Sequence, residues 1–331
     1  MTKCRNPGAP TGALRLGRRG LLAAPFVLSL ARRAMAQGRP IRIVVPFAAG
    51  SEPDILARRL GAAMHPILDQ PVVVDNRPGA NTVIAAAHVA QSRPDGETIL
   101  LTSSSTFATL PNLYTPPPVQ LDQFKAMTMA MRAHMVLYVS NDVPANSIPE
   151  LLQWANAQPE PILYGANRGA IGHLCGERMK QITGIRMTDV SYRGSLGMQQ
   201  LLMSGDIKLA FDGVPAHAEM VNTGRIKALG ITATHPIPML PNVRPLAEQG
   251  YGDIAMSYWY GIFAPKGTPQ PILARQIDAI HRAQRTEELT HQFAAQGAEL
   301  QGNSPEEFHR MIDSEREIWG ALIRAIDLRL D

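Results

Sequence analysis

The sequence predicts an α/β protein with two lobes, each a mostly parallel sheet flanked by helices. Short apolar runs alternate with helical patterns along the chain, which is typical of a doubly wound sheet. The 331-residue chain begins with a leader-like segment of 36 residues, so about 295 residues remain. That length is more than one hydrophobic core usually serves, so we expect two lobes.

Residues 1–36 have the layout of a secretory signal peptide. They contain seven basic and no acidic residues, an apolar run over Leu21–Ala31 and the small-x-small sequence Ala34–Ala36. The apolar run is about half as long as a membrane span requires. Arg18-Arg19 also permits export by the twin-arginine route, and an ordinary signal with a basic start remains the alternative.

Removal of the leader changes the charge of the protein. The whole chain has 32 Lys+Arg and 28 Asp+Glu, so the mature chain has 25 basic residues against 28 acidic ones. The mature net charge near −3 leaves no basic stripe for nucleic acid or an anionic membrane surface. Cys175 is the single cysteine of the mature chain, which excludes an intramolecular disulfide.

The first part of the mature chain alternates strand and helix patterns within about sixty residues. Apolar runs predict strands, and apolar residues at helical spacing predict helices between them. The predicted strands are Ile41–Val45, Pro71–Asp75 and Thr98–Thr102, and the predicted helices are Ile55–Leu68 and Val83–Gln91. Strands connected in this way are parallel, with right-handed crossovers.

The remainder of the chain continues the alternation and ends in helices. The predicted strands are Met135–Ser140, Pro161–Gly165, Asp189–Gly194, Ile207–Asp212, Lys227–Thr232 and Ser257–Ala264. The predicted helices are Ile148–Ala157, His173–Thr183, Ser195–Ser204, Ala216–Thr223, Ile272–Arg285, Glu287–Gln296 and Ser304–Ile326. Ser304 followed by Pro305 is a helix-start signal. We expect residues 37–136 and 261–331 to form lobe 1 and residues 137–260 to form lobe 2.

The loop Pro46–Asp54 follows the first strand and leads into a helix. Ligands of open α/β sheets bind beyond the carboxyl ends of strands, where such loops lie. Small residues let backbone N–H groups approach a ligand, and the helix N-terminus favours an anion. We therefore interpret this loop as half of a carboxylate site. The alternative is a tight turn in which Ser51 or Asp54 caps the helix.

The loop Tyr164–His173 has the same form and is the second candidate. Its glycines do not have dinucleotide-binding spacing, so a nucleotide site is not predicted. Arg168 is either a partner for a carboxylate or a solvated loop arginine. Trp259 and Tyr260 are either core aromatics or residues that line a cleft where their strand crosses between lobes.

The sequence has no pattern that predicts catalysis. Gly194-Ser195-Leu196-Gly197 is not a nucleophile elbow, and the nine histidines show no metal-ligand spacing. Cys175 is either a nucleophile near a helix start or a buried structural thiol, and no base partner is evident. We predict no catalytic residue, no metal ligand and no cofactor.

Several segments in register resemble the Bug (TctC-like) family, the periplasmic solute-binding proteins of tripartite tricarboxylate transporters. The resemblance begins with Ile41–Gly50, Asp54 and Ala57-Arg58, and continues with Gln70–Ala80 and Pro94–Leu101. Further segments follow in the family's order: Pro111–Tyr114, Tyr164-Gly165, His173-Leu174, Gly176-Glu177, Tyr192–Gly194, Gly224–Ala228 and Gly261–Pro265. The resemblance covers essentially the whole mature chain.

The resemblance implies a two-lobed periplasmic-binding-protein (Venus-flytrap, type II-like) fold that closes on a carboxylate by a hinge motion. The hinge is expected near Leu137 and again near Trp259–Gly261. The two loops and the resemblance together predict the ligand contacts, which are Phe47, Ala48, Ala49, Gly50, Ser51, Asp54, Ser104, Tyr164, Gly165, Ala166, Asn167, Arg168, Gly169, Ala170, His173, Arg193 and Asp212.

Two departures from the family pattern bear on the ligand. The family usually has Gly-Gly-Pro-Thr-Asp in the first loop, whereas this chain has Gly50-Ser51-Glu52-Pro53-Asp54. Pro53 lacks an N–H donor and Glu52 adds negative charge. The second loop, Asn167–Ile171, is shorter and lacks the usual serine. These departures favour an aromatic acid, or an acid with a positive group facing Glu52, over the family's usual ligands. The sequence does not decide between a dicarboxylate, an amino acid and an aromatic acid.

The predicted function is capture of a small organic carboxylate and its delivery to the membrane components of a tripartite tricarboxylate transporter. The protein is expected to be a periplasmic monomer that does not bind nucleic acid. One alternative is a sensor whose closed form docks on a membrane receptor, and a remote alternative is a cysteine-dependent enzyme. The sequence does not separate transport from sensing, since both require the same fold.

Overall fold

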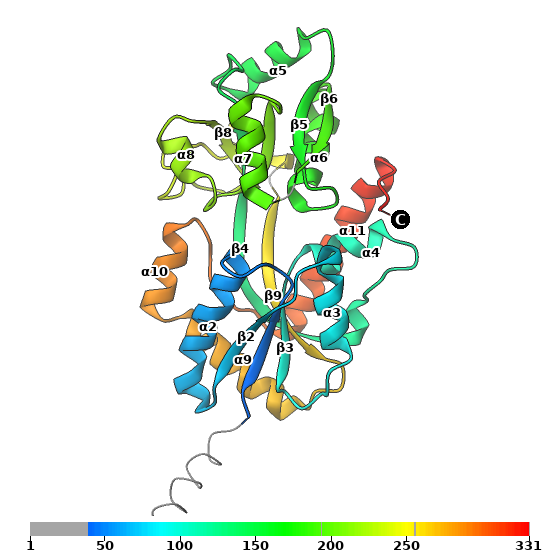
Figure 1. Cartoon of the computed structure of the whole chain (residues 1–331), viewed down its shortest axis with the longest axis vertical. Coiled ribbons are helices and arrows are strands. Elements are labelled where there is room, and N and C mark those ends of the chain that lie inside the picture. Colours follow the sequence, from blue (N-terminus) through cyan, green and yellow to red (C-terminus); the bar gives the residue numbers. More distant parts are fainter. Residues whose placement is uncertain (1–38, 193, 255, 331) are drawn as a thin grey trace, which may run out of the picture. The chain divides into compact units, whose positions relative to one another are not determined.

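The computed structural model describes residues 39–192, 194–254 and 256–330. The leader predicted over residues 1–36 lies outside the described residues. Pro40–Asp331 forms one compact unit. Within it, two lobes are joined by two long strands, β4 and β9 (Figure 1). No helix among the described residues is long and apolar enough to cross a membrane.

The strands of the first lobe are mixed in direction. β1 (Ile41–Val45) pairs in parallel with β2 (Val72–Asn76) and β3 (Thr98–Ser103), and β3 pairs antiparallel with β9 (Ser257–Pro265). The first part of β4 (Phe124–Val139) pairs antiparallel with β9. The order in this part of the sheet is therefore β2-β1-β3-β9-β4.

The second lobe has the same mixture. β5 (Ile162–Ala166) pairs in parallel with β6 (Met187–Ser191) and β7 (Leu209–Gly213). The end of β4 pairs antiparallel with β7 and with β8 (Lys227–Ile231). The α/β fold class is confirmed: each lobe has parallel strands, and β4 and β9 run antiparallel to the strands with which they pair.

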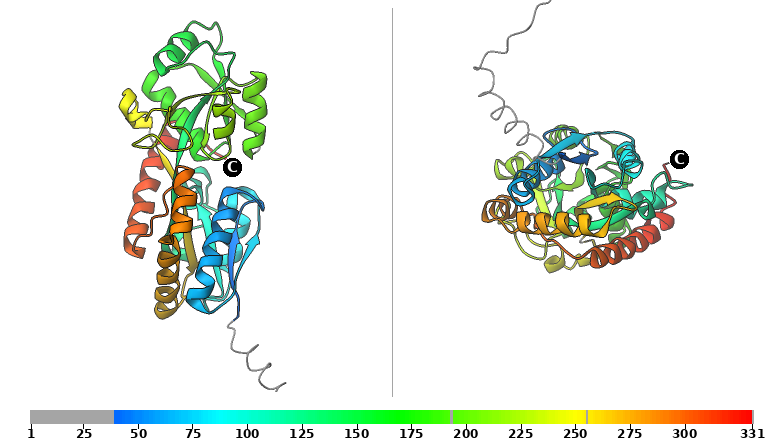
Figure 2. Two further views of the ribbon diagram at one scale, coloured as in Figure 1. Left: turned by 90° about the vertical axis from the view of Figure 1, so that its left-hand side faces the viewer. Right: turned by 90° about the horizontal axis from the view of Figure 1, so that it is seen from below.

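Helices cover both faces of each part of the sheet (Figures 1 and 2). In the first lobe, α2 (Glu52–Leu68) and α9 (Gln270–Gln284) share one core, and α3 (Val83–Ala90) and α11 (Pro305–Ala325) share the other. In the second lobe, α5 (Ile148–Asn156) and α6 (Ile171–Thr183) lie on one face, while α7 (Gly194–Ser204) and α8 (Ala218–Asn222) lie on the other.

The remaining elements are short or lie at the edges of the lobes. They are α4 (Leu110–Leu113), α10 (Glu287–Ala295), the 3-10 helices η1 (Ala80–Thr82), η3 (Leu121–Gln123), η4 (Ala247–Gln249) and η5 (Gly252–Ile254), and the π-helical turn η2 (Ser105–Thr109). The predicted cap of α11 is present, because the Ser304 hydroxyl accepts the Glu307 N–H and the Glu307 carboxylate accepts the Ser304 N–H.

The alternation of side chains along the strands separates the two cores of the first lobe. Ile43 and Val45 face the core under α2, whereas Val44 between them faces the core under α3 and α11. Successive side chains of a strand point to opposite faces, so a strand buried on both faces is apolar throughout. This explains why Ile43, Val44 and Val45 are consecutive apolar residues, whereas Arg42 before them is exposed.

One strand prediction was too short. The strand expected over Met135–Ser140 begins eleven residues earlier, since β4 starts at Phe124. The segment Phe124–His134 consists mainly of methionine, alanine and charged residues and has a single β-branched residue, Thr128, so its own propensity for strand is weak. It is a strand because β9 pairs with it along its length.

The pairing of β4 changes partner between His134 and Met135. Residues up to His134 pair with β9, and residues from Met135 onward pair with β7. The chain therefore passes from one lobe to the other slightly before Leu137, and it returns at Ser257, where β9 begins. The lobe boundaries expected at residues 137 and 260 stay a prediction.

Candidate ligand-binding site

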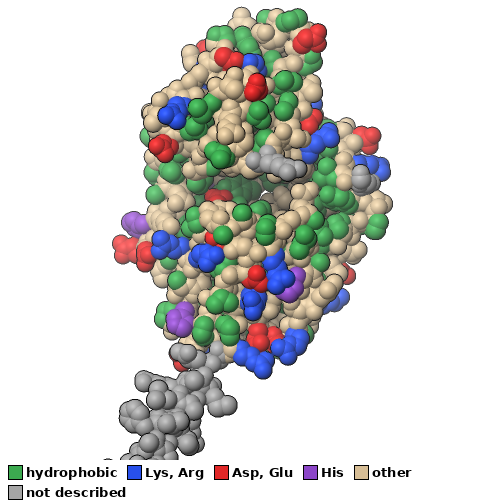
Figure 3. All heavy atoms as spheres, in the orientation of Figure 1, with side chains coloured by type: hydrophobic (Ala, Val, Ile, Leu, Met, Phe, Trp, Pro, Cys, Tyr) green, Lys and Arg blue, Asp and Glu red, His purple; other side chains and the backbone are tan. Residues whose placement is uncertain are grey.

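Two adjoining cavities lie between the lobes. The first cavity has a volume of about 900 Å³ and the second about 620 Å³. They are parts of one cleft, because six residues line both of them: Phe47, Ser103, Ser105, Asn167, Ala170 and Gly194. The space-filling view shows the surface hollowed between the lobes (Figure 3). A cleft of this size encloses a small organic molecule.

The first predicted loop is held in place by Asp54. The buried Asp54 carboxylate accepts hydrogen bonds from the Gly50 N–H at 2.8 Å, from Arg58 Nε at 3.0 Å and from Asn76 Nδ2 at 2.9 Å. These donors hold the pKa of Asp54 below its ordinary value although burial acts in the opposite direction. Asp54 therefore fixes the conformation of the loop.

Ser51 occupies the N-cap position of α2 without capping it by its side chain. Its hydroxyl donates to the Ala48 carbonyl at 2.6 Å. Gly50 has φ +81°, a conformation that residues with a Cβ rarely adopt. The turn places Glu52 at the first helical position with its carboxylate toward the second cavity.

The second loop is fixed from both of its ends. Gly169, at φ +81°, donates its N–H to His173 Nδ1 at 3.3 Å, and its carbonyl accepts the Thr109 hydroxyl at 3.1 Å. The Ala170 N–H bonds to the Asn167 carbonyl at 2.9 Å. The turn brings the N-terminus of α6 to the cleft, where its first N–H groups have no partner within the helix.

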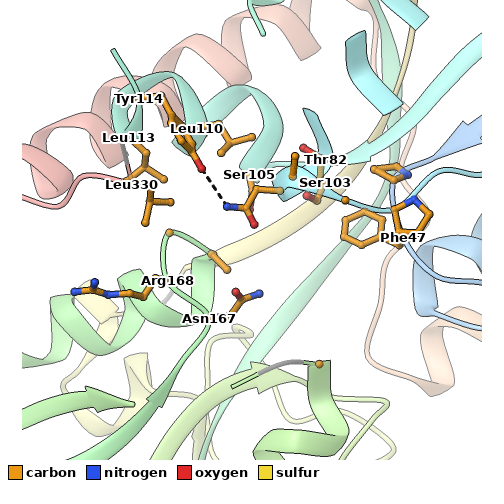
Figure 4. Close-up of a pocket in the computed structure, with 18 of the residues that line it drawn as sticks. Phe47, Thr82, Ser103, Ser105, Leu110, Leu113, Tyr114, Asn167, Arg168 and Leu330 are labelled. Carbon is orange, nitrogen blue, oxygen red and sulfur yellow. Dashed lines mark hydrogen bonds between the residues drawn. The ribbon is translucent and has the colours of Figure 1, made fainter. Parts of the chain in front are cut away.

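Arg168 is already paired in this structure. Its Nε lies 3.0 Å from Asp189 Oδ2 on the neighbouring strand β6. Figure 4 shows the Arg168 guanidinium directed away from Asn167 and from the centre of the first cavity. Asp189 therefore offsets much of the charge that Arg168 would offer to a carboxylate.

Three consecutive serines lie at the end of strand β3, at the bottom of the cleft. Ser103 and Ser105 line both cavities, and Ser104 lines the second cavity. Ser104 is fully buried, and its hydroxyl has no hydrogen-bond partner. A buried polar group without a partner costs about 1–3 kcal/mol, so this hydroxyl is well suited to a bound ligand.

Glu52 forms a cluster with two tyrosines of β9. The Tyr258 hydroxyl lies 2.9 Å from Glu52 Oε2, and the Tyr260 hydroxyl lies 3.1 Å from the same oxygen. Burial raises the pKa of Glu52, the two hydroxyls lower it, and the nearby Asp212 charge raises it again. Burial and the Glu52 charge also raise the pKa of both tyrosines, which keeps their hydroxyls protonated as donors.

Asp212 is oriented by a buried histidine. His217 Nε2 lies 2.9 Å from Asp212 Oδ2, and the Gly213 N–H donates to Asp212 Oδ1 at 2.8 Å. The Gln199 amide nitrogen, which donates to the Ala216 carbonyl, lies 3.2 Å from His217 Nδ1. With the Gln199 amide as the donor to Nδ1, His217 Nε2 is the nitrogen that donates to Asp212.

Aromatic rings surround the acidic end of the second cavity. Phe47 and Tyr260 meet edge to face with centroids 6.1 Å apart, and Tyr258 and Tyr260 do so at 5.8 Å. Phe293 also lines this cavity. Trp259, which lies between the two tyrosines in sequence, is buried on the opposite face of β9 and donates to Glu315 at 2.7 Å.

The first cavity has a different lining. Figure 4 shows Thr82, Ser103 and Ser105 on one side, facing Asn167 and Arg168 on the other. Leucines close its far end together with Tyr114, whose hydroxyl accepts a bond from Asn81 at 3.4 Å. Its only charged lining residue within the described part of the chain is Arg168.

Nine of the predicted contact residues line one or both cavities. They are Phe47, Gly50, Ser51, Ser104, Asn167, Arg168, Gly169, Ala170 and Asp212. Seven others lie behind or beside the lining: Ala48, Ala49, Asp54, Tyr164, Gly165, Ala166 and His173. Arg193 lies outside the described residues.

Two of the residues behind the lining support the second loop. The buried Tyr164 hydroxyl donates to Glu177 at 2.5 Å, and His173 accepts the Gly169 N–H. The resemblance of Tyr164 and His173 to family positions did not indicate whether these residues contact a ligand or hold the loop in place. Contact with a ligand stays a prediction for every residue of the set.

Sequence reasoning missed several lining residues. Among them are Ser103, Ser105, Ser195, Gly213, Tyr258 and Phe293. Ser103 and Ser105 lie at the end of the third predicted strand, so the rule that placed the other two loops at the cleft applied to them as well. Tyr258 and Tyr260 alternate with Trp259, and this period of two marks them as one face of a strand.

Cys175 lies away from both cavities. Burial raises the pKa of the Cys175 thiol to about 12, and neither cavity is lined by this side chain. No group of three His, Cys, Asp or Glu side chains in the described ranges is arranged to hold a metal ion.

Comparison with known proteins gives the class to which this architecture belongs. The family model described as tripartite tricarboxylate transporter family receptor, TctC, matches residues 56–328. The chain belongs to this family of periplasmic solute-binding proteins, and the fold and the predicted family are thereby confirmed.

Individual relatives agree with this assignment. Protein BugT of Bordetella pertussis is 30% identical over 88% of this chain and 90% of its own. The structure of an R. palustris protein with adipate is 29% identical, with a TM-score of 0.80, over 88% of this chain and 98% of that one. MatC from Rhodopseudomonas palustris with bound malate is 25% identical, with a TM-score of 0.76, over 86% and 99%.

Proposed function

We propose that this protein captures a small organic carboxylate in the cleft between its lobes and delivers it to a membrane transporter. The observation that carries the proposal is the buried hydroxyl of Ser104, which has no partner and lines the cleft where the lobes meet. The two solved relatives described above hold adipate and malate, both of which are carboxylates.

The carboxylate is expected to bind where three structural features converge. Ser104 and Ser105 follow strand β3, Asn167 lies opposite them, and α6 begins immediately after Ala170. The first N–H groups of a helix of thirteen residues carry a partial positive charge that favours an anion. Hydrogen bonds to an ionised carboxylate contribute about 1.5–3 kcal/mol each, so a few donors suffice without a lysine.

Closure of the lobes is expected to occur by a hinge at the two strand crossings. β4 changes partner after His134, and β9 begins at Ser257, so the chain crosses between the lobes at these two points. On this basis we assign residues 40–134 and 257–331 to lobe 1 and residues 135–256 to lobe 2. The ligand would contact both lobes and thereby favour the closed state.

The proposal also covers the export of the protein, its membrane partners and the fate of the ligand. The basic and then apolar segment over residues 1–36 supports secretion to the periplasm, by the general or the twin-arginine route. We propose that the closed monomer docks on a tripartite tricarboxylate transporter, and the alternative is docking on a sensory receptor. The ligand is expected to leave unchanged, because the buried Cys175 thiol does not reach the cleft.

Calorimetric titration of the purified mature protein tests the proposal. Adipate, malate and a panel of amino acids and aromatic acids are the probes, and Ser104→Ala is the test variant. Loss of the hydroxyl should weaken carboxylate binding by about tenfold, as expected for one hydrogen bond to a charged group. Ser92→Ala, outside both cavities, is the control. Absence of binding by every carboxylate would refute the proposal.

The alternatives have separate tests. Recovery of an altered ligand after incubation would support the enzyme interpretation, and recovery of the unchanged ligand would exclude it. Uptake of the identified ligand by cells should fall when the transporter's membrane components are deleted. Unchanged uptake with a lost transcriptional response to the ligand would favour the sensory alternative.

A further inference from the structure

The second cavity is acidic. Of the described residues that line it, Glu52 and Asp212 are charged, and none is lysine, arginine or histidine. A second carboxylate of a ligand would meet these two acids without a compensating cation. Like charges at close range in a partly desolvated cleft repel each other. The lining therefore disfavours a dicarboxylate that fills this cavity.

The two acids belong to one continuous cluster. The Tyr258 hydroxyl donates to Glu52. The same hydroxyl lies beside Gly213, the residue after Asp212, because a Cβ added to Gly213 would be 2.9 Å from the hydroxyl oxygen. Glu52 comes from the first lobe and Asp212 from the second. A group bound between them would therefore contact both lobes.

The two acids keep acceptor capacity for a ligand. The Glu52 carboxylate accepts hydrogen bonds from the Tyr258 and Tyr260 hydroxyls. The Asp212 carboxylate accepts hydrogen bonds from His217 and from the Gly213 N–H. A carboxylate offers about four lone-pair sites, so each group has room for a further donor. The edge-to-face rings of Phe47, Tyr258 and Tyr260 add π-faces of the kind that attract alkylammonium groups.

The same cavity also contains a hydroxyl donor without a partner. Ser104 is fully buried with an unpartnered hydroxyl, and it lines the second cavity together with Glu52 and Asp212. Its backbone N–H donates to the Trp259 carbonyl at 2.8 Å, which places Ser104 beside the strand that carries the two tyrosines. The anion-accepting and cation-accepting groups are thus close enough for one small molecule to touch both.

We propose that the ligand is a zwitterion, with its carboxylate at Ser104 and the N-terminus of α6 and its ammonium group between Glu52 and Asp212. The proposal rests on the proposed function, because it assumes that the cleft holds a carboxylate. It narrows the class to acids that also carry a cationic nitrogen, in particular ω-amino acids and their N-methylated betaines.

A ligand series tests the charge requirement directly. ω-Amino acids of increasing chain length, their N-trimethylated betaines, the unsubstituted monoacids and the matched diacids are titrated by calorimetry. The wild-type protein should bind the best zwitterion about ten- to a hundredfold more tightly than the diacid or the monoacid of equal length, as expected for one charge-assisted contact. Equal or tighter binding of the diacid would overturn the proposal.

Substitutions in the acidic cluster give the second test. Glu52→Gln keeps an acceptor for the tyrosines and removes the charge, and Asp212→Asn does the same at the other acid. Each should weaken the zwitterion about tenfold or more and leave the monoacid within about twofold. Glu287→Gln, whose side chain is 91% exposed, is the matched control and should change neither.

The outcomes separate this inference from the proposed function. Tight binding of monoacids and diacids that is unaffected by Glu52→Gln would refute the zwitterion and leave carboxylate capture intact. Binding of zwitterions that is lost in both variants while melting curves remain those of folded protein would support the inference. Absence of any carboxylate binding by the wild-type protein would overturn both.

Discussion

Glu315 gives a prediction about stability that is independent of any ligand. Its carboxylate accepts the indole N–H of the buried Trp259 at 2.7 Å. Burial raises the pKa of Glu315 from its ordinary value of 4.5 to about 7, although this hydrogen bond and the Arg132 charge lower it. The folded protein therefore binds a proton at Glu315 more tightly than the unfolded chain does.

The sign of the pH dependence follows from this difference. A carboxyl group whose pKa is raised by folding favours the fold below its unfolded pKa, and this contribution is lost as the pH rises through the folded pKa. The full difference corresponds to about 3 kcal/mol at 1.36 kcal/mol per pKa unit. Because Glu315 is only partly buried, solvent screening reduces this to about 1–3 kcal/mol.

Glu315→Gln should remove the loss of stability that occurs as the pH rises. The glutamine side chain is uncharged and still offers an oxygen to the indole, so the variant should gain stability relative to wild type between pH 5 and pH 8. The gain should raise the Tm at pH 8 by about 2–12 °C, using about 2–4 °C per kcal/mol for a domain slightly smaller than this chain. Thermal unfolding followed by circular dichroism at several pH values measures it.

The control for this prediction lies on the same helix. Glu317 is exposed, so Glu317→Gln should leave the pH dependence of the Tm unchanged. If wild type and Glu315→Gln show the same difference in Tm at pH 5 and pH 8, the carboxyl group is not protonated by burial in the fold and the reasoning fails.

Three further predictions concern the second loop and the helix after it. Arg168 already pairs with Asp189 at 3.0 Å, so Arg168→Ala should weaken carboxylate binding by less than about tenfold. A larger loss of affinity in calorimetric titration would mean that the guanidinium turns to the ligand. Gly172→Ala should lower the Tm and weaken binding, since a Cβ there would overlap the Phe211 carbonyl oxygen, and an unchanged Tm would contradict this. Cys175 is fully buried, and burial raises the pKa of its thiol to about 12. It should therefore resist alkylation by iodoacetamide at pH 8 in the folded protein. Rapid labelling, detected by mass spectrometry of the intact protein, would contradict this.

Local patterns predicted most of the elements to within one or two residues. Ser304-Pro305 marked the start of α11 because the cap and the first-turn proline act through the local backbone. The strand Ile162–Ala166 was equally evident from its apolar run between turn signals. The long strand β4 was not, because the reason that Phe124–His134 is extended lies in its pairing with β9, more than a hundred residues later.

The candidate site could be predicted in position but only partly in composition. The rule that ligands bind beyond the carboxyl ends of strands placed Phe47 and Asn167 at the cleft, where they lie. It did not distinguish Asp54, which turns inward to hold the loop, from the residues that face the cleft. That distinction depends on side-chain direction, which follows from packing rather than from position in a loop.

The role of Glu52, one of the departures of the first loop from the family pattern, can be understood only from the structure. In the sequence, Glu52 was an acid in a loop expected to hold an anion, which is a contradiction. In the structure, Tyr258 and Tyr260 donate to its carboxylate, and Asp212 approaches from the second lobe. The contradiction disappears if the two charges of the ligand bind at different places, the anion beside Ser104 and the cation beside Glu52. Since Glu52 and Asp212 belong to different lobes, a cation between them would reduce a repulsion that opposes closure, and ligand charge would then control lobe closure as well as affinity.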